Sequence, residues 1–324
     1  MKAIVYRKNG PPEVLTYEEV ERPAPKEKEV LIKVRAAAVN PLDYHMMKGG
    51  PALMRLLFGP RKPKVPGVDV AGVVEAVGPG VTQFKAGDAV FGSSRGAFAE
   101  YTVAPETALA AKPEAVSFED AAACPVAALT ALQGLRNKGK IQAGQNVLIN
   151  GASGGVGTFA VQFAKYFGAH ATAVCSARNT AMVRSLGAER VIDYSGEDFT
   201  KGTARYDMIF DLGGNHSFSA CKRVLAPQGI HVGAGVLAGS NSIFLMLVGL
   251  LGTLAVSRFS RQKFTTYVAK VNREDLALVG ELLAGGRLKP VIDKRYKLSE
   301  AAEAIRYQGT WHARGKLVII PDTL

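Results

Sequence analysis

The sequence predicts an α/β protein with two domains, one rich in short β-strands and one built on a doubly wound parallel sheet. Its 324 residues match the length of about two average domains. In roughly the first hundred residues, short apolar runs are separated by glycine and proline, a pattern typical of a compact β-barrel-like domain. From residue 145 onward, expected strands and helices alternate, which indicates a parallel sheet covered by helices.

The elements of the first part are short. We expect an edge strand that starts at residue 2, followed by strands at 30–36, 68–77 and 97–103. Residues 119–137 predict a helix with Ser117 as its N-cap. Pro125 predicts a bend or a restart within this helix, because proline disrupts a helix interior.

The second part predicts one βα unit after another. The expected strands are 147–149, 171–175, 191–194, 207–211 and 230–233, and the expected helices are 156–167, 180–186 and 275–285. The apolar tail at 316–320 predicts a strand that returns to the first domain.

Composition argues against several classes of protein. The hydrophobic share of 48% supplies a core, while a mean hydropathy of +0.08 is too low for a membrane-spanning protein. The N-terminus has no long apolar stretch and is not a signal peptide, so we expect a cytoplasmic protein. Cys124, Cys175 and Cys221 are widely spaced, which fits a reducing compartment and excludes a four-cysteine zinc site.

The chain carries a net charge of +12, but its basic residues are scattered and show no nucleic-acid-binding motif. We therefore expect no nucleic-acid partner. The uncharged run at 243–256 is shorter than the roughly 20 residues that span a bilayer, and Arg258, Arg261 and Lys263 follow it. A buried interface or a covering helix is the favoured interpretation, and peripheral contact with a membrane is the alternative.

The segment 150–157, Asn-Gly-Ala-Ser-Gly-Gly-Val-Gly, joins an expected strand to an expected helix. It aligns as Ala152-x-Gly154-x-x-Gly157, with alanine where a dinucleotide fingerprint has its first glycine. Small residues let a pyrophosphate approach the N–H groups of the helix start. The predicted cofactor-binding residues of this turn are Ala152, Ser153, Gly154, Gly155, Val156 and Gly157. A purely structural strand-to-helix turn is the alternative.

The second strand of this unit favours NADPH over NADH. A carboxylate that binds the ribose of NAD is expected about 20 residues beyond the glycines, but the strand ends with Ser176, Ala177 and Arg178. Ser176 and Arg178 are suited to a 2′-phosphate, although Arg178 also fits an ordinary surface arginine. Tyr194, at the end of the next expected strand, is a weaker candidate for contact with the adenosine.

Five motifs resemble one family over nearly the whole chain. They are Asn40-Pro41-Leu42-Asp43-Tyr44, the segment 65–72, the segment 127–131, the turn Gly154-Gly155-Val156-Gly157 and the segment 313–316. The chain resembles zinc-independent medium-chain dehydrogenases/reductases of the quinone oxidoreductase type, near the chloroplast-envelope and reticulon-interacting mitochondrial branch.

The resemblance implies a GroES-like catalytic domain of residues 1–122 and 290–324, and a Rossmann NADP(H)-binding domain of residues 123–289. It places the active site in the cleft between them and implies a homodimer. Asn40 takes the place of the first zinc-binding cysteine of related alcohol dehydrogenases, and Val68-Asp69 stands where their Gly-His-Glu motif lies. We therefore expect no metal.

The resemblance also implies roles for single residues. Asn40 and Thr130 are expected near the nicotinamide, Gly233, Ala234 and Gly235 beside its ring, and Leu212 and Lys316 in contact with the cofactor. Asp43 and Tyr44 are candidate proton donors or orienting residues, with packing and loop-anchoring as the alternatives. The five histidines, His45, His170, His216, His231 and His312, show no metal-ligand spacing in the sequence.

Without a metal, hydride transfer requires an acceptor that delocalises the charge, such as a quinone or an α,β-unsaturated carbonyl. The sequence therefore predicts an NADPH-dependent reductase of such small molecules. One-electron reduction of quinones is one alternative. A cofactor-binding scaffold, or a membrane-associated partner protein with little turnover, is another.

Overall fold

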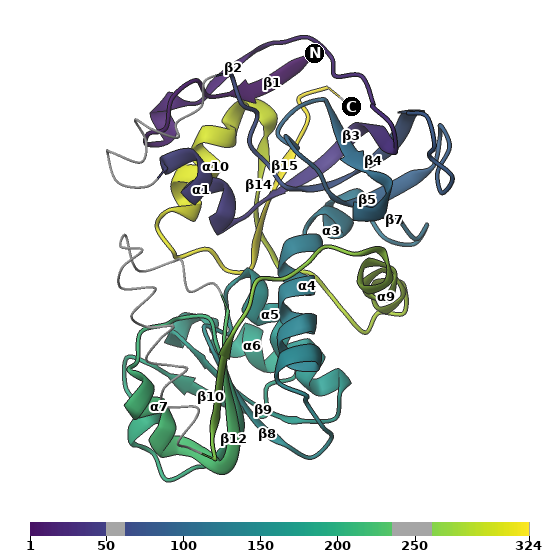
Figure 1. Ribbon diagram of the computed structural model, residues 1–324. Coiled ribbons are helices and arrows are strands. Elements are labelled where there is room, and N and C mark those ends of the chain that lie inside the picture. Colours follow the sequence, from purple (N-terminus) through teal and green to yellow (C-terminus); the bar gives the residue numbers. More distant parts are fainter. Residues whose placement is uncertain (50–61, 235–260, 324) are drawn as a thin grey trace. The chain divides into compact units, whose positions relative to one another are not determined.

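The computed structural model describes residues 1–49, 62–234 and 261–323 (Figure 1). The chain forms two compact units. The first contains Met1–Leu129 and Val271–Leu324, and the second contains Thr130–Lys270. Most of the strands and helices expected from the sequence are present, and the fold is α/β as predicted.

The first unit is built on a seven-stranded sheet in the order β14-β15-β3-β4-β5-β7, with β6 paired to β3. Its strands are β3 (Glu29–Val39), β4 (Asp69–Val77), β5 (Ala89–Ser93), β6 (Tyr101–Pro105), β7 (Leu109–Ala111), β14 (Ile292–Lys297) and β15 (Lys316–Ile320). A separate pair joins β1 (Lys2–Val5) to β2 (Thr16–Glu19). Because β15 pairs antiparallel with β3, the predicted return of the chain's tail to the first domain is confirmed.

In the first unit, the helix start predicted at Ser117 and the restart predicted at Pro125 are confirmed. Ser117 Oγ accepts a hydrogen bond from Asp120 N–H and caps α3 (Phe118–Ala122), and the chain restarts at Pro125 as α4 (Pro125–Leu132). A π-helical turn, Gln133–Lys138, completes the expected helix. The other helices are α1 (Pro41–Lys48), α9 (Arg273–Ala284) and α10 (Ala301–Gln308).

The boundaries of the units differ from the expected domain boundaries. The first falls between residues 129 and 130, inside α4, and the second falls between residues 270 and 271 rather than between 289 and 290. The reason is the packing of α9. Its Gly280 lies against Phe91 and Pro113, so that a Cβ there would be 3.4–3.5 Å from their rings. Helix α9 therefore belongs to the first unit.

The second unit is a six-stranded parallel sheet in the order β10-β9-β8-β11-β12-β13. Its strands are β8 (Asn146–Asn150), β9 (His170–Cys175), β10 (Arg190–Asp193), β11 (Tyr206–Asp211), β12 (Leu225–Gly233) and β13 (Lys263–Thr266). Helices α5 (Gly155–Tyr166) and α6 (Thr180–Ser185) lie on one face, and α7 (Phe218–Val224) lies on the other (Figure 1). No helix among the described residues is long and apolar enough to cross a bilayer.

The direction of strand succession reverses between β8 and β11, and ligands of such sheets bind at the carboxyl ends of the strands at this point. The turn from β8 into α5 lies there. Gly151 has φ +85°, a left-handed conformation that favours glycine. A Cβ at Gly157 would lie 2.1 Å from the carbonyl oxygen of Gly151, whereas a Cβ at Gly154 would meet only that oxygen, at 3.6 Å. Gly157 therefore serves close packing, and the side of Gly154 is open.

These contacts predict different outcomes for two alanine substitutions. Gly157→Ala forces the β8–α5 turn apart and should lower the free energy of unfolding by about 1–3 kcal/mol, the usual cost of overpacking. Gly154→Ala is the matched control and should change it by less than about 0.5 kcal/mol. Urea unfolding followed by circular dichroism measures both values. Equal stability of the two variants would contradict the assigned packing role of Gly157.

Candidate functional site

The glycine turn presents the open N-terminus of a helix. Gly154 is the N-cap of α5, and the N–H groups of Gly155, Val156 and Gly157 have no acceptor within the helix, because they belong to its first turn. Ser153, Gly154, Gly155 and Val156 are partly exposed. Such a helix start attracts an anion through its N–H groups and its dipole. The predicted phosphate contacts of this turn therefore have donors available.

Ala152 differs from the rest of the turn. It is completely buried, and both its N–H and that of Gly151 donate to the carbonyl oxygen of Val174, at 3.0 and 3.2 Å. Gly151, rather than residue 152, has the left-handed conformation. Ala152 thus anchors the turn to β9 and offers no free donor to a ligand. The left-handed position of the turn thus lies one residue before the one that the fingerprint alignment gives. Gly151, beside Ala152 in the sequence, was the signal for this difference.

An amide and a carboxylate brace the strand ends beside this turn. Asn150 Nδ2 donates to Asp211 Oδ1 at 2.8 Å, and the N–H groups of Gly213 and Gly214 donate to the same oxygen at 3.1 and 3.0 Å. Burial alone would raise the pKa of Asp211. Hydrogen bonds from His231, Gly214 and Asn150 outweigh burial and hold that pKa below its usual value. An ionised Asp211 therefore fixes the loop that follows β11.

The same brace places two predicted cofactor residues. Leu212 N–H donates to Asn150 O at 3.0 Å, and Ala234 N–H donates to Asp211 O at 3.0 Å. Leu212 is partly exposed and flanks Gly151, whereas Ala234 and Gly233, at the end of β12, are buried. Gly235 lies outside the described residues. The structure thus places Leu212 beside the glycine turn, and Gly233 and Ala234 beside the end of β11.

The predicted adenosine-end residues lie at the ends of β9 and β10. These strands pair in parallel, with Asp193 opposite Cys175, so Ser176 and Tyr194 follow at neighbouring positions. Ser176 is partly buried and accepts from Asn179 Nδ2 at 3.1 Å, Arg178 is exposed, and Tyr194 is 58% exposed. The carboxylate of Asp193 accepts hydrogen bonds from Ser195.

Thr130 lies in α4, at the first position of the second unit. It is partly buried, and its carbonyl oxygen accepts a short hydrogen bond from the hydroxyl of Tyr267.

In the first unit, three polar residues meet at one end of three neighbouring strands. Asn40 follows β3, Asp69 begins β4 and Lys316 begins β15, and the register pairs Ala38 with Asp69 and Val39 with Leu317. This register brings residues 40, 69 and 316 together. They are 2%, 0% and 3% exposed.

Hydrogen bonds connect these three side chains. Lys316 Nζ donates to Asn40 Oδ1 at 2.6 Å, to Val39 O at 3.1 Å and to Asp69 Oδ2 at 3.2 Å. Asn40 Nδ2 donates to Asp69 Oδ2 at 2.9 Å, and Asp69 Oδ1 accepts from Val126 N–H at 2.9 Å. The ammonium predicted to contact the cofactor is thus engaged within the first unit. Burial raises the pKa of Asp69, and the nearby Lys316 opposes this rise.

Asp43 lies in the first turn of α1, where its carboxylate accepts from Asn40 N–H at 2.8 Å. The side chain is 2% exposed, and burial raises its pKa to about 7. The carboxyl group of Asp43 therefore gains or loses its proton near neutral pH. Tyr44 is partly buried and makes edge contacts with His45 and Trp311, at centroid distances of 5.8 and 6.5 Å. These aromatic contacts support the packing alternative for Tyr44.

Sequence reasoning did not identify Asn150, Asp211 or the pairing of Asp69 with Lys316. Asn150 and Asp211 each end a strand of the parallel sheet, and polar residues at strand ends were the available signal. The pairing of Asp69 with Lys316 joins positions 247 residues apart and depends on strand register.

A zinc ion does not fit beside Asn40 and Asp69 in the first unit. The amide oxygen of Asn40 accepts a hydrogen bond from the Lys316 ammonium, and Asp69 forms an ion pair with the same ammonium. An amide and a carboxylate that surround a lysine cation offer no site for a second cation.

Comparisons with known proteins cover both units. Residues 26–114 match the alcohol dehydrogenase GroES-like domain, and residues 186–319 match the zinc-binding dehydrogenase family. The chain is 36% identical over 323 residues to the chloroplast envelope quinone oxidoreductase homolog of Arabidopsis thaliana, covering 95% of this chain and 94% of that protein. It is 35% identical to the chloroplastic NADPH-dependent alkenal/one oxidoreductase of the same plant, covering 99% and 80%.

A solved structure agrees with these relatives. The quinone oxidoreductase of Coxiella burnetii has a TM-score of 0.87 and 33% sequence identity, with 99% of both chains covered. The predicted GroES-like and Rossmann folds are thereby confirmed. The chain belongs to the quinone oxidoreductase group of the medium-chain dehydrogenases/reductases, a family of NAD(P)-binding oxidoreductases.

Proposed function

We propose that the protein uses NADPH to reduce quinones or the activated C=C bond of α,β-unsaturated carbonyls, without zinc. The observation that carries this proposal is the buried ammonium of Lys316, which is bonded to Asn40 and Asp69, the residues that the resemblance aligns with alcohol dehydrogenase metal ligands. With no Lewis acid to polarise an isolated carbonyl, the acceptor must itself delocalise the incoming charge. The printed names of the Arabidopsis relatives, a quinone oxidoreductase homolog and an alkenal/one oxidoreductase, support the same substrate classes.

The residues of the second unit fit a dinucleotide. A Cβ at Gly154 would meet only the carbonyl oxygen of Gly151, at 3.6 Å, and the first-turn N–H groups of the helix are suited to bind an anion there. Gly154, Gly155 and Val156 would hold the pyrophosphate, Leu212 would line its flank, and Ser176 and Arg178 would hold the 2′-phosphate. When bound, NADPH supplies the hydride.

In the first unit, Lys316 and Asp69 act as positioning residues. Both ends of the Asn40 amide are engaged, which fixes its orientation and the start of α1. Asp43 lies on that helix, and because its pKa is about 7, its carboxyl group is partly protonated near neutral pH. We assign to this network the orientation of α1, which carries Asp43 and Tyr44. The homodimer, the cytoplasmic location and the role of 243–256, which lies outside the described residues, stay predictions.

The experiment that tests the function is a screen of NADPH oxidation. A panel of quinones, enones and simple ketones should show turnover with the first two classes and none with ketones, and prior treatment with EDTA should not reduce the rate. Turnover of ketones that EDTA abolishes would contradict the proposal. Semiquinone detected by electron paramagnetic resonance would favour one-electron chemistry, and tight NADPH binding without turnover would favour a scaffold.

Arg178→Ala tests the choice of cofactor. Loss of one charged hydrogen-bonding partner costs about 1.5–3 kcal/mol, so the Kd for NADPH should rise about 10- to 100-fold while that for NADH stays within about twofold. Arg184→Ala, an exposed arginine on the adjacent helix α6, is the matched control. Fluorescence titration gives both constants. Equal losses for the two nucleotides would refute the role of Arg178.

The variant Lys316→Met distinguishes a positioning role of Lys316 from a direct contact between Lys316 and the cofactor. The change removes the ammonium from between Asp69 and Asn40, so kcat should fall more than tenfold while the Kd for NADPH stays unchanged. A rise in the Kd would instead support the cofactor contact expected from the sequence. Because an unpaired buried carboxylate costs about 3–5 kcal/mol, the double variant Asp69→Asn/Lys316→Met should be more stable than the single one in urea unfolding.

A further inference from the structure

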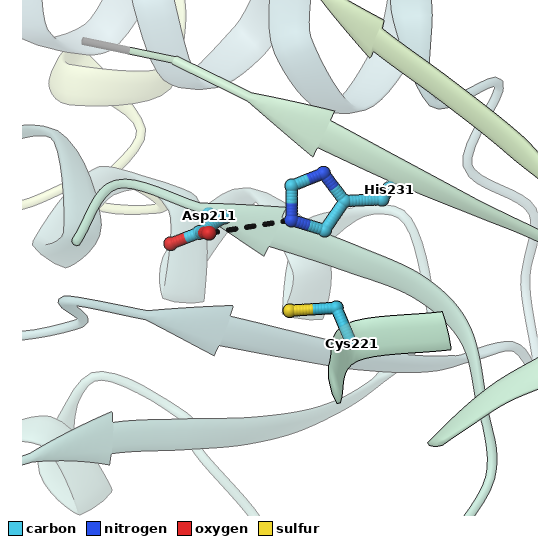
Figure 2. A group of neighbouring side chains, drawn as sticks. All are labelled: Asp211, Cys221 and His231. Atoms are coloured by element: carbon cyan, nitrogen blue, oxygen red, sulfur yellow. Dashed lines mark hydrogen bonds and ion pairs between the residues drawn. The ribbon is translucent and has the colours of Figure 1, made fainter. Parts of the chain in front are cut away.

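In the second unit, three side chains of types that bind metal ions lie close together, and each comes from a different element. Asp211 ends β11, Cys221 lies in α7 and His231 lies in β12 (Figure 2). One carboxylate oxygen, the thiol sulfur and one imidazole nitrogen all lie within 4.8 Å of one another. From this geometry we propose that Asp211, Cys221 and His231 bind a zinc ion.

Strand register brings two of the three ligands together. Strands β11 and β12 are parallel neighbours, with Ile209 opposite His231. Since side chains alternate along a strand, Asp211 extends from the same face of the sheet as Ile209, next to His231. Asp211 Oδ2 and His231 Nε2 lie 3.2 Å apart, and α7 covers this face with the completely buried Cys221.

Neighbouring groups orient these ligands. Asp211 Oδ1 is engaged by Asn150 and by the N–H groups of Gly213 and Gly214, so Oδ2 is the oxygen directed toward His231. The ring of Phe264 stacks on the imidazole, with centroids 5.4 Å apart and planes inclined by 26°. Such outer contacts fix ligand geometry in metal sites. Among the residues that the structure describes, Cys221 Sγ has no hydrogen-bond partner, which leaves it available as a ligand.

The donor set selects the type of cation. A thiolate, an imidazole and a carboxylate suit Zn²⁺, whereas Mg²⁺ and Ca²⁺ prefer oxygen ligands. Binding releases the Cys221 proton to solvent, and the charges of Zn²⁺, the thiolate and the Asp211 carboxylate then sum to zero. The His231 side chain is 16% exposed, which leaves a side on which water completes a tetrahedral site.

This site is separate from the zinc site of alcohol dehydrogenases. By the resemblance, that site corresponds to Asn40 and Val68-Asp69 in the first unit, where Asp69 is paired with Lys316. The present ligands all belong to the second unit, within one sheet and its covering helix. The inference does not depend on the proposed reductase activity, because metal binding is measured without turnover.

The test uses the full-length protein, stripped with EDTA and freed of chelator, and titrated with Co²⁺ as a spectroscopic probe. A thiolate-to-Co²⁺ charge-transfer band should appear, saturate at one equivalent and disappear when Zn²⁺ is added, because Zn²⁺ binds such sites more tightly than Co²⁺. Zn²⁺ should also raise the melting temperature of the stripped protein by at least about 2 °C. Absence of the band would overturn the proposal.

Variants assign the band to these residues. Cys221→Ser and His231→Gln should each abolish it, whereas Cys175→Ser, which alters another buried cysteine of the second unit, should retain it. Far-ultraviolet circular dichroism reports folding. If the Cys221→Ser variant does not fold, the band of the His231→Gln variant still tests the assignment, because His231 is partly exposed. A band that survives in His231→Gln, or that is lost in a folded Cys175→Ser, would overturn the assignment.

Discussion

The buried ammonium of Lys316 holds together three parts of the first unit that lie far apart in the chain. It bonds to the end of β3, to Asn40 at the start of α1 and to Asp69 at the start of β4. A buried charge is tolerated only where it is paired and hydrogen-bonded, so the pairing constrains all three segments together. The orientation of the Asn40 amide and the starting point of α1 follow from this one interaction.

The second unit contains a comparable interaction, a hydrogen bond between the amide of Asn150 and the carboxylate of Asp211. Asn150 and Asp211 join the ends of β8 and β11, where the strand order reverses, and the loop after β11 is tied to the same carboxylate. The glycine turn therefore has a rigid neighbour on one side. A rigid surrounding lowers the entropic cost of ordering a bound dinucleotide.

Much of this fold could be predicted from local patterns. The strand-to-helix turn at the glycine segment, the capping residue Ser117 and the restart at Pro125 depend on a few neighbouring residues, and each of these local features was found. Long-range features could not be predicted in this way. The pairing of Lys316 with Asp69 depends on the register of β3 with two partners, and the assignment of α9 to the first unit depends on packing against Phe91. The convergence of Cys221 and His231 likewise requires the sheet order.

The position of β15 has a consequence for the order in which the chain acquires its structure. This strand lies between β14 and β3, so the sheet of the first unit is completed only by residues that follow the whole second unit in the sequence. The second unit is continuous from Thr130 to Lys270 and has all its strands before that point. During translation, β3 therefore lacks one of its neighbours until β15 has been synthesised. The parallel sheet of the second unit is able to form before that point. Removal of residues 316–324 would leave β3 without this neighbour and Asp69 without its cation.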